Sequence, residues 1–117
     1  MKPSSEAYSI VASPVFRVSL VRFRSFIEHN YSAALAEGVV TKIKTKIKQQ
    51  LSANPSIAPI SERLLNLGIA DYRQWCVDDF NLVFYRVDEV NHQVELLALI
   101  SAKQSIRKLL FEVNLLL

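Results

Sequence analysis

The chain has 117 residues, of which 50% are hydrophobic and 21% are charged. This is the length and composition of one globular domain, so we predict a single domain over residues 1–117. A single cysteine, Cys76, excludes an internal disulfide, and no apolar run approaches the roughly 20 residues that a membrane helix needs. The polar start at residues 1–6 does not resemble a signal peptide. Together these features predict a soluble cytoplasmic protein that contacts no membrane.

The formal net charge of +3 is small, but the basic residues are clustered. Lys42, Lys44, Lys46 and Lys48 fall within seven residues. Such a run forms either the solvated face of a helix or a surface that attracts nucleic acid or an acidic protein segment. We favour the solvated face.

The first half of the chain predicts a short strand followed by a helical hairpin. Residues 8–12 are β-prone, and Ser13-Pro14 supplies a hydroxyl cap and a proline at the first helical position. Apolar residues then recur at spacings of four, three and four, which is the period of a helix: Phe16, Leu20, Phe23 and Ile27. We expect this helix to end near His29-Asn30.

A second helix is predicted from a cap at Ser32 to the stop at Asn54-Pro55. Its apolar face is expected to consist of residues spaced by four: Leu35, Val39, Ile43, Ile47 and Leu51. The lysine run alternates as a strand would, but the longer period over 35–51 favours the helix. After it, residues 61–67 are ambiguous and are expected to cover the edge of the core, with one helical turn as an option.

The second half predicts a three-stranded meander over residues 72–77, 80–87 and 94–100, with a polar turn after each strand. Cys76 is expected to be a small core residue. One side of the last strand should carry Val94, Leu96, Ala98 and Ile100. Both sides of the strands are largely apolar, so we expect helices over one face and other elements over part of the second face.

A last helix is predicted to begin at a Ser105 cap, with one apolar face: Ile106, Leu109, Leu110 and Val113. Seven of the nine residues from Leu109 to Leu117 are large and apolar, Phe111 and Leu115 among them. A monomer rarely leaves such a patch in water. Either this helix packs on the open face of the sheet, or a second copy or another chain covers it.

No constellation of residues in the sequence announces a reaction. There is no glycine-rich phosphate loop, and His29 and His92 lie far apart without ligand-spaced neighbours, so we predict no cofactor and no metal. Trp75 is expected in the core or an interface, and stacking on a nucleic-acid base is a less favoured alternative. The basic residues nearest the sheet and the last helix either neutralise phosphate or form surface ion pairs, the interpretation we favour: Arg73, Arg86, Lys103 and Arg107.

The order of elements resembles the RelE/ParE toxin superfamily of type II toxin–antitoxin modules. The resemblance is carried by Tyr8-Ser9-Ile10-Val11, the exit from the second helix at 51–55, Tyr72-Arg73, and the strand patterns at 82–88 and 94–100. It covers about residues 8–107. It implies an α+β domain with an N-terminal strand, a helical hairpin, a three-stranded antiparallel meander and a C-terminal helix.

The resemblance also implies a cognate antitoxin, often an acidic segment that wraps over the toxin. RelE-like members cut ribosome-bound messenger RNA with basic residues and a tyrosine, whereas ParE-like members bind DNA gyrase. Arg73 fits a basic position of the nuclease set, and the basic position after the last strand falls near Lys103 to Ser105. The chain departs from the set elsewhere: Trp75 stands in place of a lysine, Asn81 in place of an arginine and Phe111 in place of the tyrosine.

We therefore expect a ParE-like protein rather than an enzyme, with Arg73 and Lys103 as the only catalytic residues to consider. A RelE-like ribosome-dependent endonuclease and a diverged, non-toxic protein that forms a homodimer are the alternatives. Direct nucleic-acid binding is not favoured. The residues expected to contact a partner are Trp75, Arg86, Arg107, Leu110, Phe111 and Leu115.

Overall fold

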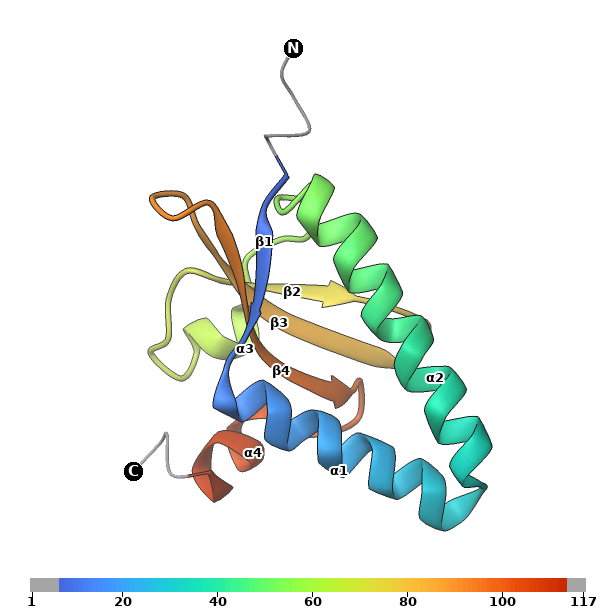
Figure 1. Ribbon diagram of the computed structural model, residues 1–117. Coiled ribbons are helices and arrows are strands. Elements are labelled where there is room, and N and C mark those ends of the chain that lie inside the picture. Colours follow the sequence, from blue (N-terminus) through green and yellow to red (C-terminus); the bar gives the residue numbers. More distant parts are fainter. Residues whose placement is uncertain (1–6, 114–117) are drawn as a thin grey trace.

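The computed structural model describes residues 7–113, in which four strands form one mixed sheet with helices on both faces (Figure 1). The strands β1 (Ser9–Ala12), β2 (Tyr72–Cys76), β3 (Asn81–Asp88) and β4 (Gln93–Ser101) lie in the order β1-β4-β3-β2. The strand β1 pairs in parallel with β4, and the other two pairings are antiparallel. The α+β architecture expected from the sequence is therefore confirmed.

The helices α1 (Pro14–Asn30) and α2 (Ala33–Lys46) form the predicted hairpin and diverge as a V from their turn near Tyr31 (Figure 1). A π-helical turn, Ile47–Leu51, continues α2. The short helices α3 (Glu62–Leu65) and α4 (Ile106–Glu112) follow later in the chain. Within residues 7–113 no helix combines the length and the apolar character needed to cross a membrane.

In the described part of the chain a serine caps the start of each α-helix, as the sequence predicted for Ser13, Ser32 and Ser105. The hydroxyl oxygen accepts the backbone N–H three residues later, for example Phe16 N to Ser13 Oγ at 3.0 Å and Lys108 N to Ser105 Oγ at 3.1 Å. Ser32 and Ser61 do the same for α2 and α3. These bonds satisfy N–H groups that the helix itself leaves without partners.

One core cluster lies between the sheet and the hairpin. Phe16 of α1 and Ile43, Ile47 and Leu51 of α2 and its π-turn pack against the sheet. The sheet contributes inward-facing side chains from β2, β3 and β4: Trp75, Val83, Tyr85, Val94, Leu96 and Leu99. A second cluster lies on the other face, where Leu64 of α3 and Ile106, Leu109 and Leu110 of α4 cover Leu82, Phe84, Ala98 and Ile100. Each face of the sheet therefore has its own apolar cover.

The prediction that Leu35 belongs to the buried face of α2 was wrong. Each residue of an α-helix turns by about 100° about the axis, so residues four apart are offset by about 40°. Over several such steps a row of residues spaced by four moves off the buried face. The structure exposes Leu35 and buries Ala36 and Val40 in the same helix instead. Lys42, Lys44 and Lys48 are exposed, which confirms the helical interpretation of the lysine run.

The expectation of one apolar side along β4 was also wrong beyond Leu96. Tyr85 pairs with Leu96 and Phe84 with Ala98, so Leu97 is an extra residue in the ladder. Such a β-bulge reverses the alternation of side chains. Val94 and Leu96 therefore face the hairpin, whereas Ala98 and Ile100 face α4.

Two further side chains lie elsewhere than expected. Cys76 is exposed rather than part of the core, because its neighbours Trp75 and Val77 are buried and successive residues of an extended chain point to opposite sides. Phe80 precedes β3 instead of beginning it and is 75% exposed. The carboxylate of Asp78 accepts the backbone N–H groups of Phe80 and Asn81, each at 2.8 Å, so the turn ends only at Asn81.

Candidate functional site

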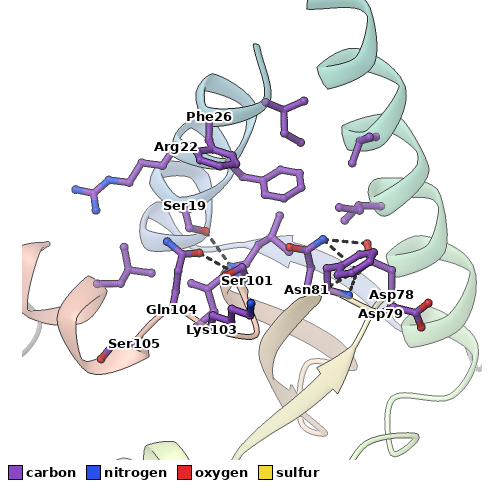
Figure 2. Close-up of a pocket in the computed structure, with 18 of the residues that line it drawn as sticks. Ser19, Arg22, Phe26, Asp78, Asp79, Asn81, Ser101, Lys103, Gln104 and Ser105 are labelled. Atoms are coloured by element: carbon purple, nitrogen blue, oxygen red, sulfur yellow. Dashed lines mark hydrogen bonds between the residues drawn. The ribbon is translucent and has the colours of Figure 1, made fainter. Parts of the chain in front are cut away.

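A large groove lies between the open arms of the hairpin and one end of the sheet. We call it the hairpin groove; its volume is about 1260 Å³. Figure 2 shows α1 and α2 as its two walls, with the β2–β3 turn and the β4–α4 loop at its base. The residues that line it come from these four regions, the α1–α2 turn, the adjoining ends of β3 and β4, and α4: Ser19, Arg22, Phe23, Phe26, Ile27, Tyr31, Val39, Lys42, Ile43, Lys46, Asp78, Asp79, Phe80, Asn81, Leu99, Ile100, Ser101, Lys103, Gln104, Ser105, Lys108, Leu109 and Glu112.

The base of the hairpin groove is held by polar contacts. Ser19 on α1 is buried, and its Oγ accepts the backbone N–H of Leu99 at 2.9 Å while donating to the carbonyl of Phe16 at 2.8 Å. Asn81 Nδ2 donates to the Asp78 carboxylate at 3.0 Å. Gln104 Oε1 accepts the backbone N–H of Ser101 at 2.7 Å. Figure 2 shows the Asn81–Asp78 and Gln104–Ser101 bonds at the base of the groove, below Ser19.

Basic side chains outnumber acidic ones around the hairpin groove, five to three. Two of the three carboxylates are engaged: Asp78 closes its turn, and Glu112 pairs with Arg22 at 2.7 Å. Lys46 Nζ donates to the backbone carbonyl of Val77 at 2.5 Å. Because a carbonyl has no net charge, this contact does not neutralise the lysine. The side chains that line the hairpin groove therefore carry an excess of positive charge.

The structure separates the two basic residues considered for catalysis. Lys103 lies in the loop after β4 and lines the hairpin groove. Arg73 lies on β2 opposite Tyr85, and its Nη1 donates to the carbonyl of Ala58 at 2.5 Å. Tyr85 in turn pairs with Leu96, which lies five residues before the end of β4 at Ser101. Arg73 therefore lies away from the end of the sheet at which Lys103 follows β4.

The residues expected to contact a partner are dispersed. Trp75 and Leu110 are buried in the two core clusters, so Trp75 is a core residue, as the favoured interpretation held. Arg86 pairs with Glu95 across two strands, with Arg86 Nε 2.9 Å from Glu95 Oε1, and this pairing raises the pKa of Arg86. Arg107 and Phe111 are exposed on α4. Leu115 lies outside the described residues.

Reasoning from the sequence missed the aromatic rim of the hairpin groove. Phe26, Tyr31 and Phe80 all line it, and they are 62%, 70% and 75% exposed. Phe26 falls outside the buried stripe of α1, and Phe80 directly follows a pair of aspartates. The sequence signal for this rim was an aromatic residue outside the apolar period of its helix, as Phe26 is in α1.

In the part of the chain that the structure describes, no three His, Cys, Asp or Glu side chains lie together as a metal site would require. What the hairpin groove offers is binding chemistry. It combines exposed aromatic rings, the partly buried side chains of Phe23 and Val39, and ammonium groups in a single concavity.

Comparison with known proteins rests on structure. No family model and no curated protein sequence matches the chain. A solved chain from the chromosomal ParDE toxin–antitoxin system of P. aeruginosa superposes with a TM-score of 0.67 at 16% identity, covering 84% of this chain and 99% of that chain. A chain of the RelBE2 toxin–antitoxin complex of Mycobacterium tuberculosis superposes with a TM-score of 0.53 at 16% identity, covering 81% and 98%. The protein therefore has the fold of the RelE/ParE toxin superfamily, as the order of its elements predicted.

Proposed function

We propose that this protein is the toxin of a type II toxin–antitoxin module, that it acts in the ParE manner by binding DNA gyrase, and that a cognate antitoxin neutralises it. The observation that carries the proposal is the likeness to the ParDE chain, which extends over 84% of this chain and nearly all of that one. A shared fold does not by itself determine function, so the proposal rests equally on where the structure places the basic residues.

The placement of the basic residues supports a binding protein over a nuclease. Cleavage of RNA by its own hydroxyl group requires a base, an acid and cations around one phosphate. Arg73 is bonded to a backbone carbonyl, and Lys103 lines a groove at another part of the sheet. Phe111 has no hydroxyl, and its ring is exposed on α4 rather than lining the hairpin groove.

Regulated expression in a bacterial host tests the proposal. Induction of the full chain alone should stop growth, and co-expression of the reading frame adjacent to its gene should restore growth and yield a co-purified complex. The purified protein should then inhibit DNA supercoiling by gyrase while leaving translation on purified ribosomes intact.

Two outcomes contradict the proposal. Cleavage of messenger RNA on ribosomes that is abolished by Arg73→Ala or Lys103→Ala would identify the RelE-like endonuclease instead. Unimpaired growth upon induction of soluble, folded protein would identify the diverged, non-toxic protein. In that case size-exclusion chromatography with light scattering would show whether it forms the homodimer.

A further inference from the structure

A small pocket lies where β1 leads into α1, on the face of the sheet that α3 and α4 cover in part (Figure 1). We call it the β1 pocket; its volume is about 270 Å³. Val11, Ala12 and Pro14 give it an apolar wall, and two polar side chains, Tyr72 and Glu95, also line it. We propose that the β1 pocket binds an aliphatic ammonium group. This inference goes beyond the proposed function and does not depend on it.

The strand register brings the polar side chains at the β1 pocket together. Val11 on β1 lies opposite Glu95 on β4. On the other side of Glu95 lie Arg86 on β3 and then Tyr72 on β2. Residues paired across neighbouring strands direct their side chains to the same face of a sheet. One row across the sheet therefore places an apolar side chain, a carboxylate, a guanidinium and a phenol next to one another.

Two oxygen atoms of this row are open to a ligand. Arg86 Nε donates to Glu95 Oε1 at 2.9 Å, and Arg86 Nη2 donates to the same oxygen. Within residues 7–113, no group donates to Glu95 Oε2, and the Tyr72 hydroxyl makes no hydrogen bond. The Glu95 side chain is 30% exposed, so solvent reaches it. A donor that enters the β1 pocket can therefore bond a carboxylate oxygen and a phenol oxygen without displacing a protein contact.

The charges around the β1 pocket favour a cation over an anion. Glu95 chiefly, and Asp88 with a smaller effect, raise the pKa of Arg86. Asp88 itself bonds the side chain of Asn91, which is neutral, so the Asp88 charge remains. Two carboxylates thus act on one guanidinium, and this part of the sheet carries an excess of negative charge although the whole chain has a net charge of +3.

The size and the apolar wall restrict the ligand to a short aliphatic chain. Pockets for drug-sized ligands span about 300–1,000 Å³, and the β1 pocket is smaller, at about 270 Å³. Val11 and Pro14 are exposed and Ala12 is partly buried, so carbon surface is accessible beside the carboxylate. A methylene chain can lie along that wall while its terminal ammonium group donates to Glu95 and Tyr72.

Titration of the full chain with small probes tests this assignment. Pentylamine should shift the backbone amide signals of the residues that line the β1 pocket in NMR spectra, saturably and with a Kd of about 1 mM. Pentanol has the same chain without the charge, and pentanoate has the opposite charge. Both should bind about tenfold or more weakly, because neither offers a charged donor to the carboxylate.

An aliphatic ammonium group occurs in free amines and in lysine side chains, and a further probe distinguishes these sources. This probe is a single lysine with its amino terminus acetylated and its carboxyl terminus amidated. Tighter binding of the lysine probe than of pentylamine assigns the pocket to a lysine of a protein segment. Weaker binding assigns it to a free amine.

Two glutamates in the same kind of ion pair provide a matched variant and control. Glu95→Gln should weaken pentylamine binding about tenfold or more, because the oxygen that receives the ammonium group loses its charge. Glu112→Gln makes the same change in net charge and removes the ion pair with Arg22, away from the β1 pocket. Binding to this control should stay within about twofold of the wild type.

A second pair of variants tests the pocket without removing the Arg86–Glu95 ion pair. Val11→Lys, at a position that is 39% exposed, places an ammonium group opposite Glu95 and should abolish pentylamine binding. Val21→Lys adds the same charge at an exposed position of α1 and should leave binding within about twofold. Far-UV circular dichroism shows whether each variant is folded.

Three results would overturn the inference. These are the absence of saturable shifts with pentylamine up to about 10 mM, binding of pentanol or pentanoate as tight as that of pentylamine, and equal weakening by Glu95→Gln and Glu112→Gln. None of them concerns growth arrest or gyrase, so failure of this inference is distinguishable from failure of the proposed function.

Discussion

At the scale of single residues, polar side chains connect elements that are far apart in the sequence. Ser19 on α1 bonds the backbone of Leu99 on β4, and the Tyr85 hydroxyl on β3 donates to the carbonyl of Pro55 at 2.5 Å. Among the described residues no buried side-chain nitrogen or oxygen lacks a hydrogen-bond partner. Because an unsatisfied buried group costs about 1–3 kcal/mol, these contacts select one packing of helix on sheet.

Tyr85 gives a prediction about pH. Burial raises the pKa of its phenol above the usual 10.0, against smaller opposing effects of the Ala58 backbone and the Arg73 charge. Above pH 10 the unfolded chain therefore releases the phenolic proton while the folded chain retains it. The stability that Tyr85 contributes is fully present below pH 10 and falls as pH rises beyond it.

Urea unfolding of Tyr85→Phe between pH 8 and 11 measures this effect. The variant should be about 1 kcal/mol less stable at pH 8, because the bond to Pro55 is lost, and its stability should decline less steeply than that of the wild type above pH 10. Tyr31→Phe, at an exposed tyrosine, is the control and should follow the wild type. Identical slopes for the wild type and Tyr85→Phe would show that this phenol does not titrate with unfolding.

At the scale of elements, α4 closes the second face of the sheet. Its buried residues join Leu64 of α3 over the sheet, and an ion pair between Arg22 and Glu112 connects it to α1. The described part of the C-terminal patch therefore packs on the sheet within the same chain. Phe111 is the exception and remains 62% exposed.

The different burial of two neighbouring side chains in α4 is testable. Leu110→Ala should lower the free energy of unfolding by about 2–5 kcal/mol, because Leu110 is fully buried and its removal leaves a cavity. Phe111→Ala should change it by less than about 0.5 kcal/mol. Chemical denaturation of both variants provides the measurement. A large loss for Phe111→Ala, or none for Leu110→Ala, would mean that α4 docks in another orientation.

At the scale of the whole molecule, both clusters share one sheet, and this predicts a single cooperative unit. Trp75, the only tryptophan of the chain, reports on the cluster beneath the hairpin. The strands β3 and β4 contribute side chains to both clusters. Loss of these strands from one cluster would therefore disrupt the other cluster as well. The predicted single domain over residues 1–117 should therefore unfold in one step.

Coincident transitions test that prediction. Tryptophan fluorescence and far-UV circular dichroism, followed through the same urea titration, should give one midpoint. The Leu110→Ala variant should shift both signals together, although Leu110 lies in the other cluster from Trp75. Separate midpoints would show two independently stable units.

Most of the element order could be predicted from the sequence, because it depends on short-range patterns. The serine caps at Ser13, Ser32 and Ser105, the period of α1 and the three strands all arise from residues a few positions apart. The RelE/ParE-like fold followed from that order. The candidate site could not be predicted as a whole, since its walls come from segments as distant as Arg22 and Glu112.

The sequence by itself determined the order of the helices and strands and the serine caps at which α1, α2 and α4 begin, because caps, turns and apolar periods act within a few residues. Only the tertiary structure decided that Leu97 forms a bulge, that Arg73 bonds the Ala58 carbonyl, and that Lys42 and Lys103 line one groove. Those outcomes depend on strand register and on the angle between two helices. Both are set when distant apolar surfaces pack together, and no local pattern encodes them.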